Sequence, residues 1–397
     1  MHCTFLGKGT TEDHVQDVFA RATEGETIKF GAGTFSFQNQ LTLAANGVSV
    51  LGAGPDLTTL DYGKQIAGSE GLFAQNVQRL RLEGFAVKDT KGNAIKVLGS
   101  TGVTFRKLKV TWTGSDPTAH GAYGLYPVQS KMVLVEGCVV TGASDAGLYI
   151  GQSENVIVRD NEAFENVAGI EIENTFSADV YRNKVHENTG GILVFDLPDL
   201  PQLGGHAVRV HDNDVRENNT NNFAPKGNVV GQVPAGTGLL AMANTDVEVF
   251  ANTFTGNKTA QVAIVSYLVI EIPIKDANYY PYPSKVNVHD NTFGGGGKAP
   301  DATNRLGLLL LTGVSKFPGG VVPEVVYDGI VDEKKGAGPN AMQICVRQPG
   351  THFGNLHLDK LDTQNPDLPA ITEMDPAGYD CELPPVPEVV LTGLDAK

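Results

Sequence analysis

The chain has 397 residues, enough for one large core or for several ordinary domains, and its 47 glycines and 21 prolines indicate many turns. Its formal net charge of −15 excludes a nucleic acid as partner, because phosphate binding requires clustered lysine and arginine and the sequence contains no such cluster. The sequence also predicts no transmembrane segment, since no apolar run reaches the roughly 18 residues that a membrane-spanning helix needs.

Residues 1–26 are expected to form an N-terminal cap, in which the segment TTEDHVQDVFARA predicts an amphipathic helix over the first coil. The start of the chain does not show the charged, apolar and cleavage regions of a secretory leader. Either the protein is cytoplasmic, or a leader has been removed and the protein is periplasmic or extracellular. We expect the second, and Cys3 is then a candidate for a lipid anchor.

The sequence between residues 27 and 299 is repetitive. Five segments begin with glycine and continue with apolar residues at alternate positions: GLYPVQS at Gly124, GLYIGQS at Gly147, GIEIENT at Gly169, GILVFDL at Gly191 and GLLAMAN at Gly238. Strands rich in β-branched residues end at two series of asparagines that rise in step: Asn161, Asn183, Asn213, Asn252 and Asn291, and Asn166, Asn188, Asn218 and Asn257. Two series with matching steps identify a repeat protein.

Each repeat predicts one coil of a parallel β-helix. Short strands alternate with glycine or asparagine, the residues that tolerate left-handed turns. No repeat contains a stretch long enough for an amphipathic helix, which excludes leucine-rich and ankyrin-type solenoids. We therefore expect an all-β fold, a single-stranded right-handed parallel β-helix whose coils stack at about 4.8 Å. Ile170 then lies on Leu148, Ile192 lies on Ile170, and the asparagines form ladders.

Residues 300–397 lose the repeat and are predicted to form a C-terminal cap that packs on the β-helix. This segment is rich in proline near its end, in CELPPVPEVV. The four cysteines show no C-x-x-C spacing, so a zinc site is not expected. Cys138 lies in a strand pattern and is expected in the core, whereas Cys345 and Cys381 either form a disulfide that closes the tail or remain thiols.

Thr27 to Gly294 resembles the right-handed parallel β-helix repeat proteins, a group with many carbohydrate-binding and sugar-hydrolysing members. The spacing is most similar to the mannuronan C5-epimerase and alginate-lyase-like branch, in which one coil reads Tyr-Gly-x-Asp-Pro-His-Asp. The matching segment here is YGLYPVQ, from Tyr123 to Gln129. Tyr126 and Val128 stand where that branch has its functional aspartate and histidine. The resemblance therefore implies the coil and its register but not the catalytic pair.

Residues between the inward-facing apolar positions are expected to point outward. Three outward columns result: Lys96, Tyr126, Tyr149, Glu171 and Leu193; Val128, Gly151, Glu173 and Phe195; and Gln129, Gln152, Asn174 and Asp196. Either the tyrosines and amides stack only for stability, or they form a groove in which rings pack on sugars. Glu171 and Glu173 are roughly 6.6 Å apart along the strand, which suits two carboxylates around a water in an inverting glycosidase, or a calcium ion held with Asp196.

Long insertions flank the same strands and are expected to wall the groove: FDLPDLPQLGGHAV, TNNFAPKGNVVGQVPAGT and YLVIEIPIKDANYYPYPSK. The predicted catalytic residues are Glu171, Glu173, Tyr149, Tyr126, Asp145, Asp196, Lys96, His120 and Asp116. The predicted substrate-binding residues are Tyr123, Trp112, Gln129, Gln152, Asn174, Phe195 and Tyr280. Glu173 and Asp196 are also candidate metal ligands. For Asp116, His120, Lys96 and Asp145, an ordinary role in a turn or on the surface stays open.

These residues favour a carbohydrate-active protein that acts on an acidic polysaccharide, as a lyase, an epimerase or a hydrolase. Tyr126 or Tyr149 would donate a proton, the acidic residues would act as base or ligands, and Lys96 would neutralise a uronate. Calcium is the one cofactor that this reading invokes. The alternative is a non-catalytic module that binds a glycan or a protein. Carboxylates that converge in a pocket would favour an enzyme, whereas a flat strip would favour binding.

Overall fold

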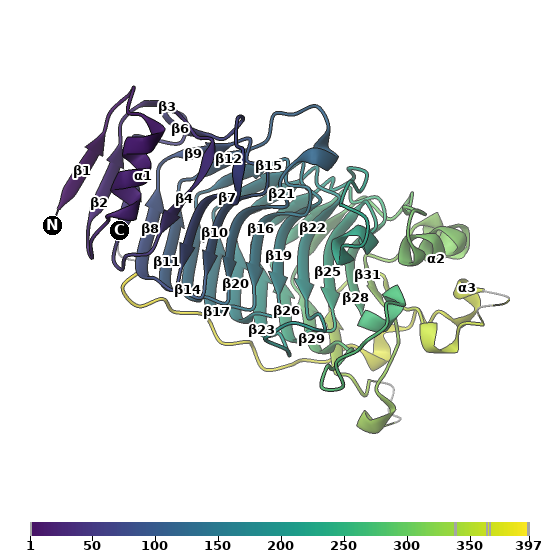
Figure 1. Cartoon of the computed structure of the whole chain (residues 1–397). Helices are drawn as coiled ribbons and strands as arrows, with labels where there is room; N and C mark the ends of the chain where they lie inside the picture. The colour runs from purple at the N-terminus through teal and green to yellow at the C-terminus, as the bar shows by residue number, and fades with distance from the viewer. Residues whose placement is uncertain (1, 337–339, 363, 365–366, 395–397) are drawn as a thin grey trace.

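Each predicted repeat forms one coil with three short strands, and the coils stack into a long solenoid (Figure 1). The computed structural model describes residues 2–336, 340–362, 364 and 367–394. Every neighbouring pair of coils is joined by parallel pairing, as between β16 and β19 or between β17 and β20. The predicted parallel β-helix is therefore confirmed.

The strands form three sheets that run the length of the solenoid. The first sheet contains β1 (Cys3–Leu6), β2 (Thr27–Phe30), β5 (Ser49–Leu51), β8 (Gln78–Glu83), β11 (Thr101–Arg106), β14 (Lys131–Glu136), β17 (Glu154–Arg159), β20 (Phe176–Tyr181), β23 (His206–His211), β26 (Thr245–Phe250), β29 (Ser284–His289) and β32 (Ile344–Arg347). The second sheet contains β4 (Asn39–Leu43), β7 (Ala67–Gln75), β10 (Asn93–Leu98), β13 (Tyr123–Val128), β16 (Ala146–Gly151), β19 (Ala168–Glu173), β22 (Gly190–Phe195), β25 (Thr237–Met242), β28 (Ala260–Val265), β31 (Val325–Tyr327) and β33 (Phe353–Asn355). The third sheet contains β3 (Gly33–Ser36), β6 (Thr58–Asp61), β9 (Ala86–Lys88), β12 (Lys109–Thr111), β15 (Val139–Thr141), β18 (Glu162–Phe164), β21 (Lys184–His186), β24 (Asp214–Arg216), β27 (Thr253–Thr255) and β30 (Thr292–Gly294).

The core lies inside the coils and consists of apolar side chains stacked in register. Leu148 pairs with Ile170 and Ile170 pairs with Ile192, as the repeat predicts. All three side chains are fully buried. Because strand residues alternate in direction, this register turns Tyr149, Glu171 and Leu193 to the outside of the coil.

Two asparagine ladders hold the corners of the coils. The Asn161 side chain donates to Asn183 Oδ1 (3.0 Å) and to the Val135 carbonyl (3.1 Å). The same pattern continues from Asn183 to Asn213 and onward. The residue before Asn161 is Asp160, which has a positive φ of 57° and makes the tight turn. The predicted ladders are therefore confirmed.

Helix α1 (Glu12–Ala20) covers the N-terminal end of the core. Thr11 caps it by accepting a hydrogen bond from the His14 N–H, and Val15 and Phe19 are buried beneath it. Strand β1 already pairs with β2, so the first sheet begins within the segment expected to be the cap. Likewise β31, β32 and β33 extend two sheets beyond residue 299.

The C-terminal segment combines short helices with an extended tail. The α-helices are α2 (Arg305–Gly313) and α3 (Leu368–Ile371). The 3-10 helices of this segment are η4 (Val314–Lys316), η5 (Pro318–Gly320), η6 (Glu333–Lys335), η7 (Leu358–Lys360) and η8 (Pro376–Gly378). Three others lie in the solenoid: η1 (Pro117–Ala119), η2 (Val229–Gln232) and η3 (Tyr267–Ile270). Within the described ranges, no helix is long and apolar enough to cross a membrane.

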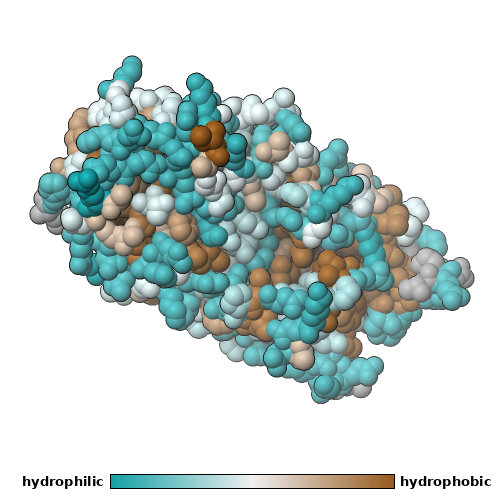
Figure 2. Space-filling model, in the orientation of Figure 1, coloured by the Kyte–Doolittle hydropathy of each residue, from teal (hydrophilic) through white to brown (hydrophobic). Residues whose placement is uncertain are grey.

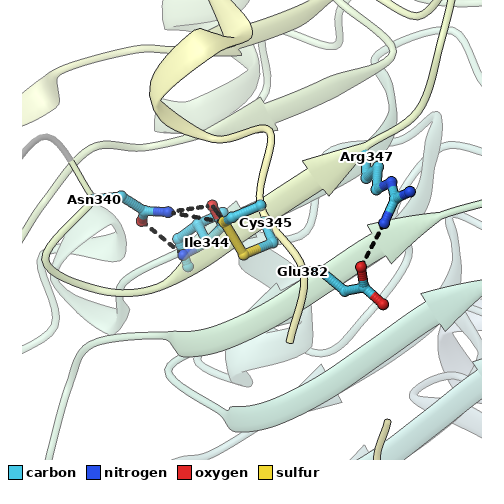
Figure 3. The surroundings of a disulfide bond; sticks show 6 residues. Asn340, Ile344, Cys345, Arg347 and Glu382 are labelled. Carbon is cyan, nitrogen blue, oxygen red and sulfur yellow. Dashed lines mark hydrogen bonds and ion pairs between the residues drawn. A yellow bond between two sulfur atoms is a disulfide. The ribbon is translucent and has the colours of Figure 1, made fainter. Parts of the chain in front are cut away.

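A disulfide between Cys345 and Cys381 joins β32 to the start of the tail. Figure 3 shows its surroundings, where the Asn340 side chain bonds the backbone of Ile344 and Arg347 pairs with Glu382. From there the tail runs back along the first sheet toward the N-terminal end (Figure 1). Its backbone is fixed on the sheet by carboxylates, as where the Val389 N–H donates to Asp179 (3.0 Å).

Candidate functional site

The outward columns on the second sheet have the predicted register. Tyr149 pairs with Glu171, and Gly151 pairs with Glu173. A Cβ atom on Gly151 would lie only 2.4 Å from the Tyr149 ring, so a glycine at this position leaves room for the ring to lie across the strand. In this position the Tyr149 hydroxyl donates to Glu173 Oε1 (2.5 Å).

Three insertions cover this part of the second sheet: the 196–205 loop after β22, the 217–236 loop before β25 and the 266–283 loop after β28. They border a cavity of about 800 Å³ that is open to solvent on one side. The residues that line it are Tyr123, Tyr126, Asp145, Tyr149, Gln152, Glu171, Glu173, Leu197, Pro198, Asp199, Leu200, Asn228, Val229, Val230, Tyr267, Ile272, Pro273 and Lys275. Figure 2 shows that hydrophobic surface on the viewed face gathers mainly toward the C-terminal half of the solenoid.

The loops bury side chains that were expected to stand in an open groove. Tyr149 is 4% exposed, Glu171 is 3% exposed and Glu173 is 7% exposed. The expectation of exposed tyrosines beside carboxylates is therefore wrong for Tyr149. The physical reason is that the insertions fold over the sheet instead of standing beside it.

Three carboxyl groups meet in the cavity, and each has a different set of partners. Asp145 Oδ2 accepts hydrogen bonds from the Asn228 side chain (2.7 Å) and from the Tyr123 hydroxyl (3.4 Å). Glu173 accepts from Tyr149. Glu171 Oε2 is buried and has no hydrogen-bond partner among the residues that the structure describes.

These partners separate the acidities of the three groups. Burial, together with the nearby Glu173 and Asp145, raises the pKa of Glu171 well above its ordinary value. Burial also raises the pKa of Asp145 and of Glu173, but hydrogen bonds to their charged forms limit each pKa to about 7. Glu171, which lacks such a hydrogen bond, is therefore the carboxyl group that favours its protonated form most, whereas Asp145 and Glu173 ionise near neutral pH.

Three tyrosine rings form one wall of the cavity. Tyr123 lies 4.6 Å from Tyr126 and 4.4 Å from Tyr149, measured between ring centroids. Burial raises the pKa of Tyr126 to about 12, and it raises the pKa of the other two as well. All three therefore remain phenols that donate hydrogen bonds, and a carboxylic acid is a better proton donor here than the predicted Tyr126 or Tyr149.

Two of the four residues in the third outward column support the loops. Asn174 donates to the carbonyls of Leu197 and Gln202 (both 2.8 Å), and Asp196 accepts from the Gly205 N–H (2.8 Å). Neither residue lines the cavity. Of the rest of this column, Gln152 lines the cavity and bonds the exposed Gln129 (3.3 Å).

Phe195, from the second column, also does not line the cavity and is fully buried. Its side chain packs in the apolar cluster beneath the loops, which also contains Leu193 and Tyr267. A side chain without exposed surface cannot contact a substrate, so the predicted substrate-binding role of Phe195 is wrong.

Five other predicted residues lie outside the cavity. Trp112 is buried and donates from Nε1 to the Thr90 carbonyl (2.8 Å). His120 stacks on Trp112, and its ring nitrogens face the carbonyls of Gly142 and Gly114. Both residues thus make structural contacts, and the substrate-binding role predicted for Trp112 and the catalytic role predicted for His120 stay predictions.

The remaining three of the five also have local partners. Asp116 accepts hydrogen bonds from Thr118 and begins the turn of η1. Lys96 Nζ lies 3.8 Å from Glu70 and 5.0 Å from the Tyr126 ring centroid, and the Tyr280 hydroxyl donates to Asp332. The cavity thus uses only part of the predicted set.

The structure gives no support for the predicted calcium site. Over the described residues, no three His, Cys, Asp or Glu side chains are arranged to hold a metal ion. Asp196 is instead bound by the backbone of the 196–205 loop. Because Asp196 does not line the cavity, it is not placed to share a calcium ion with Glu173, although the two residues occupy neighbouring outward columns in the repeat.

Sequence reasoning missed the cavity residues that the loops contribute. Asn228, which binds Asp145, is 83 residues away from it in sequence. Lys275 and Asp199 stand at the cavity in the same way. The repeat carries no information on these positions, because inserted residues have no counterpart in neighbouring coils; only the length of the insertions pointed to this face.

Comparisons with known proteins identify the scaffold. The family model described as right handed beta helix region matches residues 46–199 and 93–293. No curated protein sequence matches the chain. An alginate lyase structure from Paenibacillus sp. has 11% identity and a TM-score of 0.50, and the match covers 74% of this chain and 97% of that one.

Two further structures align with the chain at low identity. The A-module of a mannuronan C-5 epimerase from Azotobacter vinelandii has 15% identity and a TM-score of 0.46, with 72% of this chain and 82% of that one covered. A polygalacturonase from Erwinia carotovora has 12% identity and a TM-score of 0.46, with 74% and 92% covered. At these identities the likeness concerns the fold alone.

Proposed function

The chain belongs to the right-handed β-helix family, and on that scaffold we propose that it is a carbohydrate-active enzyme that hydrolyses a glycosidic bond in the cavity over β13, β16 and β19. The observation that carries the proposal is the meeting of buried carboxyl groups of different acidity in one tyrosine-lined cavity. Fold alone would not carry it, because one scaffold serves many functions.

The proposed chemistry assigns one proton step to each of two carboxyl groups. Glu171, which keeps its proton at neutral pH, donates it to the glycosidic oxygen as the C–O bond breaks. Glu173, ionised above a pKa of about 7, accepts a proton from the water whose oxygen attacks the anomeric carbon. The products are two sugars with free hydroxyl groups. Glu171 is left ionised and Glu173 protonated, so the protons balance. Tyr149 orients Glu173 through its short hydrogen bond.

Hydrolysis fits the site better than the uronate chemistry that the sequence favours. Lyases and epimerases abstract a proton next to a carboxylate, and a positive group has to neutralise that carboxylate. Lys96, the residue predicted for this role, pairs with Glu70 and does not line the cavity. Lys275 is the one basic residue in the cavity lining, and it stands exposed among four acidic ones. A polyanionic substrate would therefore meet repulsion.

The location outside the cytoplasm also stays a proposal. The Cys345–Cys381 disulfide supports it, because such bonds persist in oxidising compartments. Cys3 is an exposed free cysteine, compatible with the lipid anchor considered for it. The alternative function, a non-catalytic glycan-binding module, is less favoured, since the carboxyl groups converge in a cavity instead of lying on a flat strip.

The test is an assay of new reducing ends on neutral, acidic and amino polysaccharides, with ultraviolet absorbance followed in parallel for unsaturated uronates. We expect reducing ends without absorbance, and a loss of about a hundredfold or more in Glu171→Gln and in Glu173→Gln. Glu154→Gln is the matched control, because this residue of β17 is only half-buried, is paired with Lys131 and does not line the cavity. Absorbance would identify a lyase, and unchanged activity in both variants would refute the assignment.

A further inference from the structure

The cavity has an excess of acidic side chains that the hydrolysis proposal does not by itself require. Asp145, Glu171 and Glu173 line its floor, and the exposed Asp199 stands at its edge. The exposed Lys275 is the one basic side chain in the lining. A negatively charged ligand is disfavoured in such a space, and a positively charged one is favoured.

Glu171 has an unmet need for a donor. Glu171 is one of the residues that line the cavity, and its buried Oε2 atom has no hydrogen-bond partner in the described part of the chain. Leaving such an atom without a partner costs about 1–3 kcal/mol. Glu173 and Asp145 have protein donors but keep free acceptor capacity on the side of the cavity. A ligand with several N–H donors would complete all three groups.

The tyrosine wall offers a second feature that attracts cations. The rings of Tyr123, Tyr126 and Tyr149 lie within 4.9 Å of one another, centroid to centroid. The protein itself already places an ammonium group against one of them, because Lys96 Nζ lies 5.0 Å from the Tyr126 centroid. Aromatic faces beside carboxylates are a typical environment for organic ammonium groups.

We propose that the cavity selects a sugar with a free, protonated amino group, so that the substrate is an amino-sugar polymer and not a uronate. The sugar half of this inference rests on the proposed function, whereas the amine half rests on the cavity. The volume of about 800 Å³ is large enough for a short oligosaccharide segment. The ammonium group can donate to Asp145, which lines the same cavity and has no part in the proposed hydrolysis, so Glu171 and Glu173 on the outward face of β19 stay available for the reaction.

A metal ion is a poorer occupant of the same space. Calcium takes six to eight oxygen ligands at roughly 2.3–2.6 Å. Among the described residues no three acidic side chains converge to that degree. The tyrosine wall also offers π-faces, which calcium does not use as ligands. We therefore expect no binding of calcium in the titration below.

The proposal has a proton readout that a merely polar pocket would not give. Asp145 and Glu173 each have a pKa of about 7, and burial holds the proton on Glu171. An ammonium ligand stabilises their charged forms, so binding near pH 6 should release protons into the buffer. The other titratable groups at the cavity are Tyr123, Tyr126, Tyr149, Tyr267, Asp199 and Lys275.

The experiment is isothermal titration calorimetry at pH 6 in two buffers of different ionisation enthalpy. The ligands are a glucosamine tetramer, an N-acetylglucosamine tetramer, a galacturonate tetramer, spermidine and calcium chloride. We expect the glucosamine tetramer to bind at least about tenfold more tightly than the acetylated one, with release of protons. Asp145→Asn should weaken it by about tenfold to a hundredfold, because it removes a carboxyl group that ionises when the amine binds, and Glu154→Gln should not change it. Glu173→Gln provides a second variant if Asp145→Asn does not fold, as judged by circular dichroism.

The outcomes separate the two proposals. Equal or tighter binding of the acetylated or galacturonate tetramer would overturn the amino-sugar inference and leave the proposed function intact. Binding of spermidine without any sugar would overturn the proposed function and support the amine half alone. Binding of calcium without any amine, or no binding at all, would overturn the inference.

Discussion

Glu173 gives a test of the cavity that does not depend on any substrate. The pKa of this buried carboxyl group rises from 4.5 to about 7 in the folded protein. Between these two values the folded state holds a proton that the unfolded state releases, so stability falls as the pH rises through this range. From the difference between the two pKa values, the free energy of unfolding should be lower at pH 8 than at pH 5 by at most about 3 kcal/mol.

The substitution Glu173→Gln removes this cost without changing the shape of the side chain. The amide oxygen still accepts the hydrogen bond from Tyr149. We expect the variant to be more stable than the wild type by up to about 3 kcal/mol at pH 8 and nearly equal to it at pH 5. The loss of stability is shared with Asp145 and Glu171, because the three carboxyl groups interact. The stability of the variant should therefore still fall with rising pH, but less steeply than that of the wild type.

The assay is chemical denaturation at pH 5 and pH 8, with Glu154→Gln as the control. Glu154 forms an exposed ion pair with Lys131 and should contribute little at either pH. A Glu173→Gln variant with the same relative stability at both pH values would refute the reasoning. Glu173 would then ionise near its ordinary pKa, which requires a cavity filled with water.

Two further predictions concern packing. Gly151→Ala places a methyl group against the buried Tyr149 ring and should displace its hydroxyl from Glu173. We expect lower activity in the reducing-end assay and a loss of about 1–3 kcal/mol of stability in thermal denaturation, because the ring has to move. Asn188→Ala removes the hydrogen-bond partner of two buried groups, the Asn166 side chain and the Ala163 carbonyl. The free energy of unfolding, measured with denaturant, should fall by about 3–5 kcal/mol. A loss below about 1 kcal/mol would mean that the ladder relaxes around the gap.

The solenoid could be predicted from the sequence because each coil repeats the pattern of its neighbours. Ile170 falls on Leu148 whatever the rest of the chain does, because one step of the repeat separates them. The same step aligned Tyr149 with Glu171 and so placed the core of the candidate site on one face. What repeats was predictable to the residue.

The residues of the turns and loops were not predictable in this way. Trp112 and His120 attracted attention because they carry useful chemistry close to the Tyr123 strand. In the structure they pack on each other at the corner between the third and second sheets. Asn228 had no signal, since its contact with Asp145 depends on how a single insertion folds. Burial of the site is a property of the loops and not of the repeat.

The corners of the coil explain why the insertions gather around one sheet. Between the first and third sheets each coil turns through two residues, as at Asp160 and Asn161, and the asparagine bonds the coils on both sides. An insertion there would leave buried amide groups without partners. The corner between the third and second sheets carries the second ladder, and the 217–236 loop accommodates it because Asn218, near the start of that loop, still donates to Asn257 (3.1 Å). The 196–205 and 266–283 loops leave from the corner between the second and first sheets. All three loops therefore flank the second sheet, where they cover Glu171 and its neighbours, and they are the part of the chain that can change the ligand while the carboxyl groups stay in place.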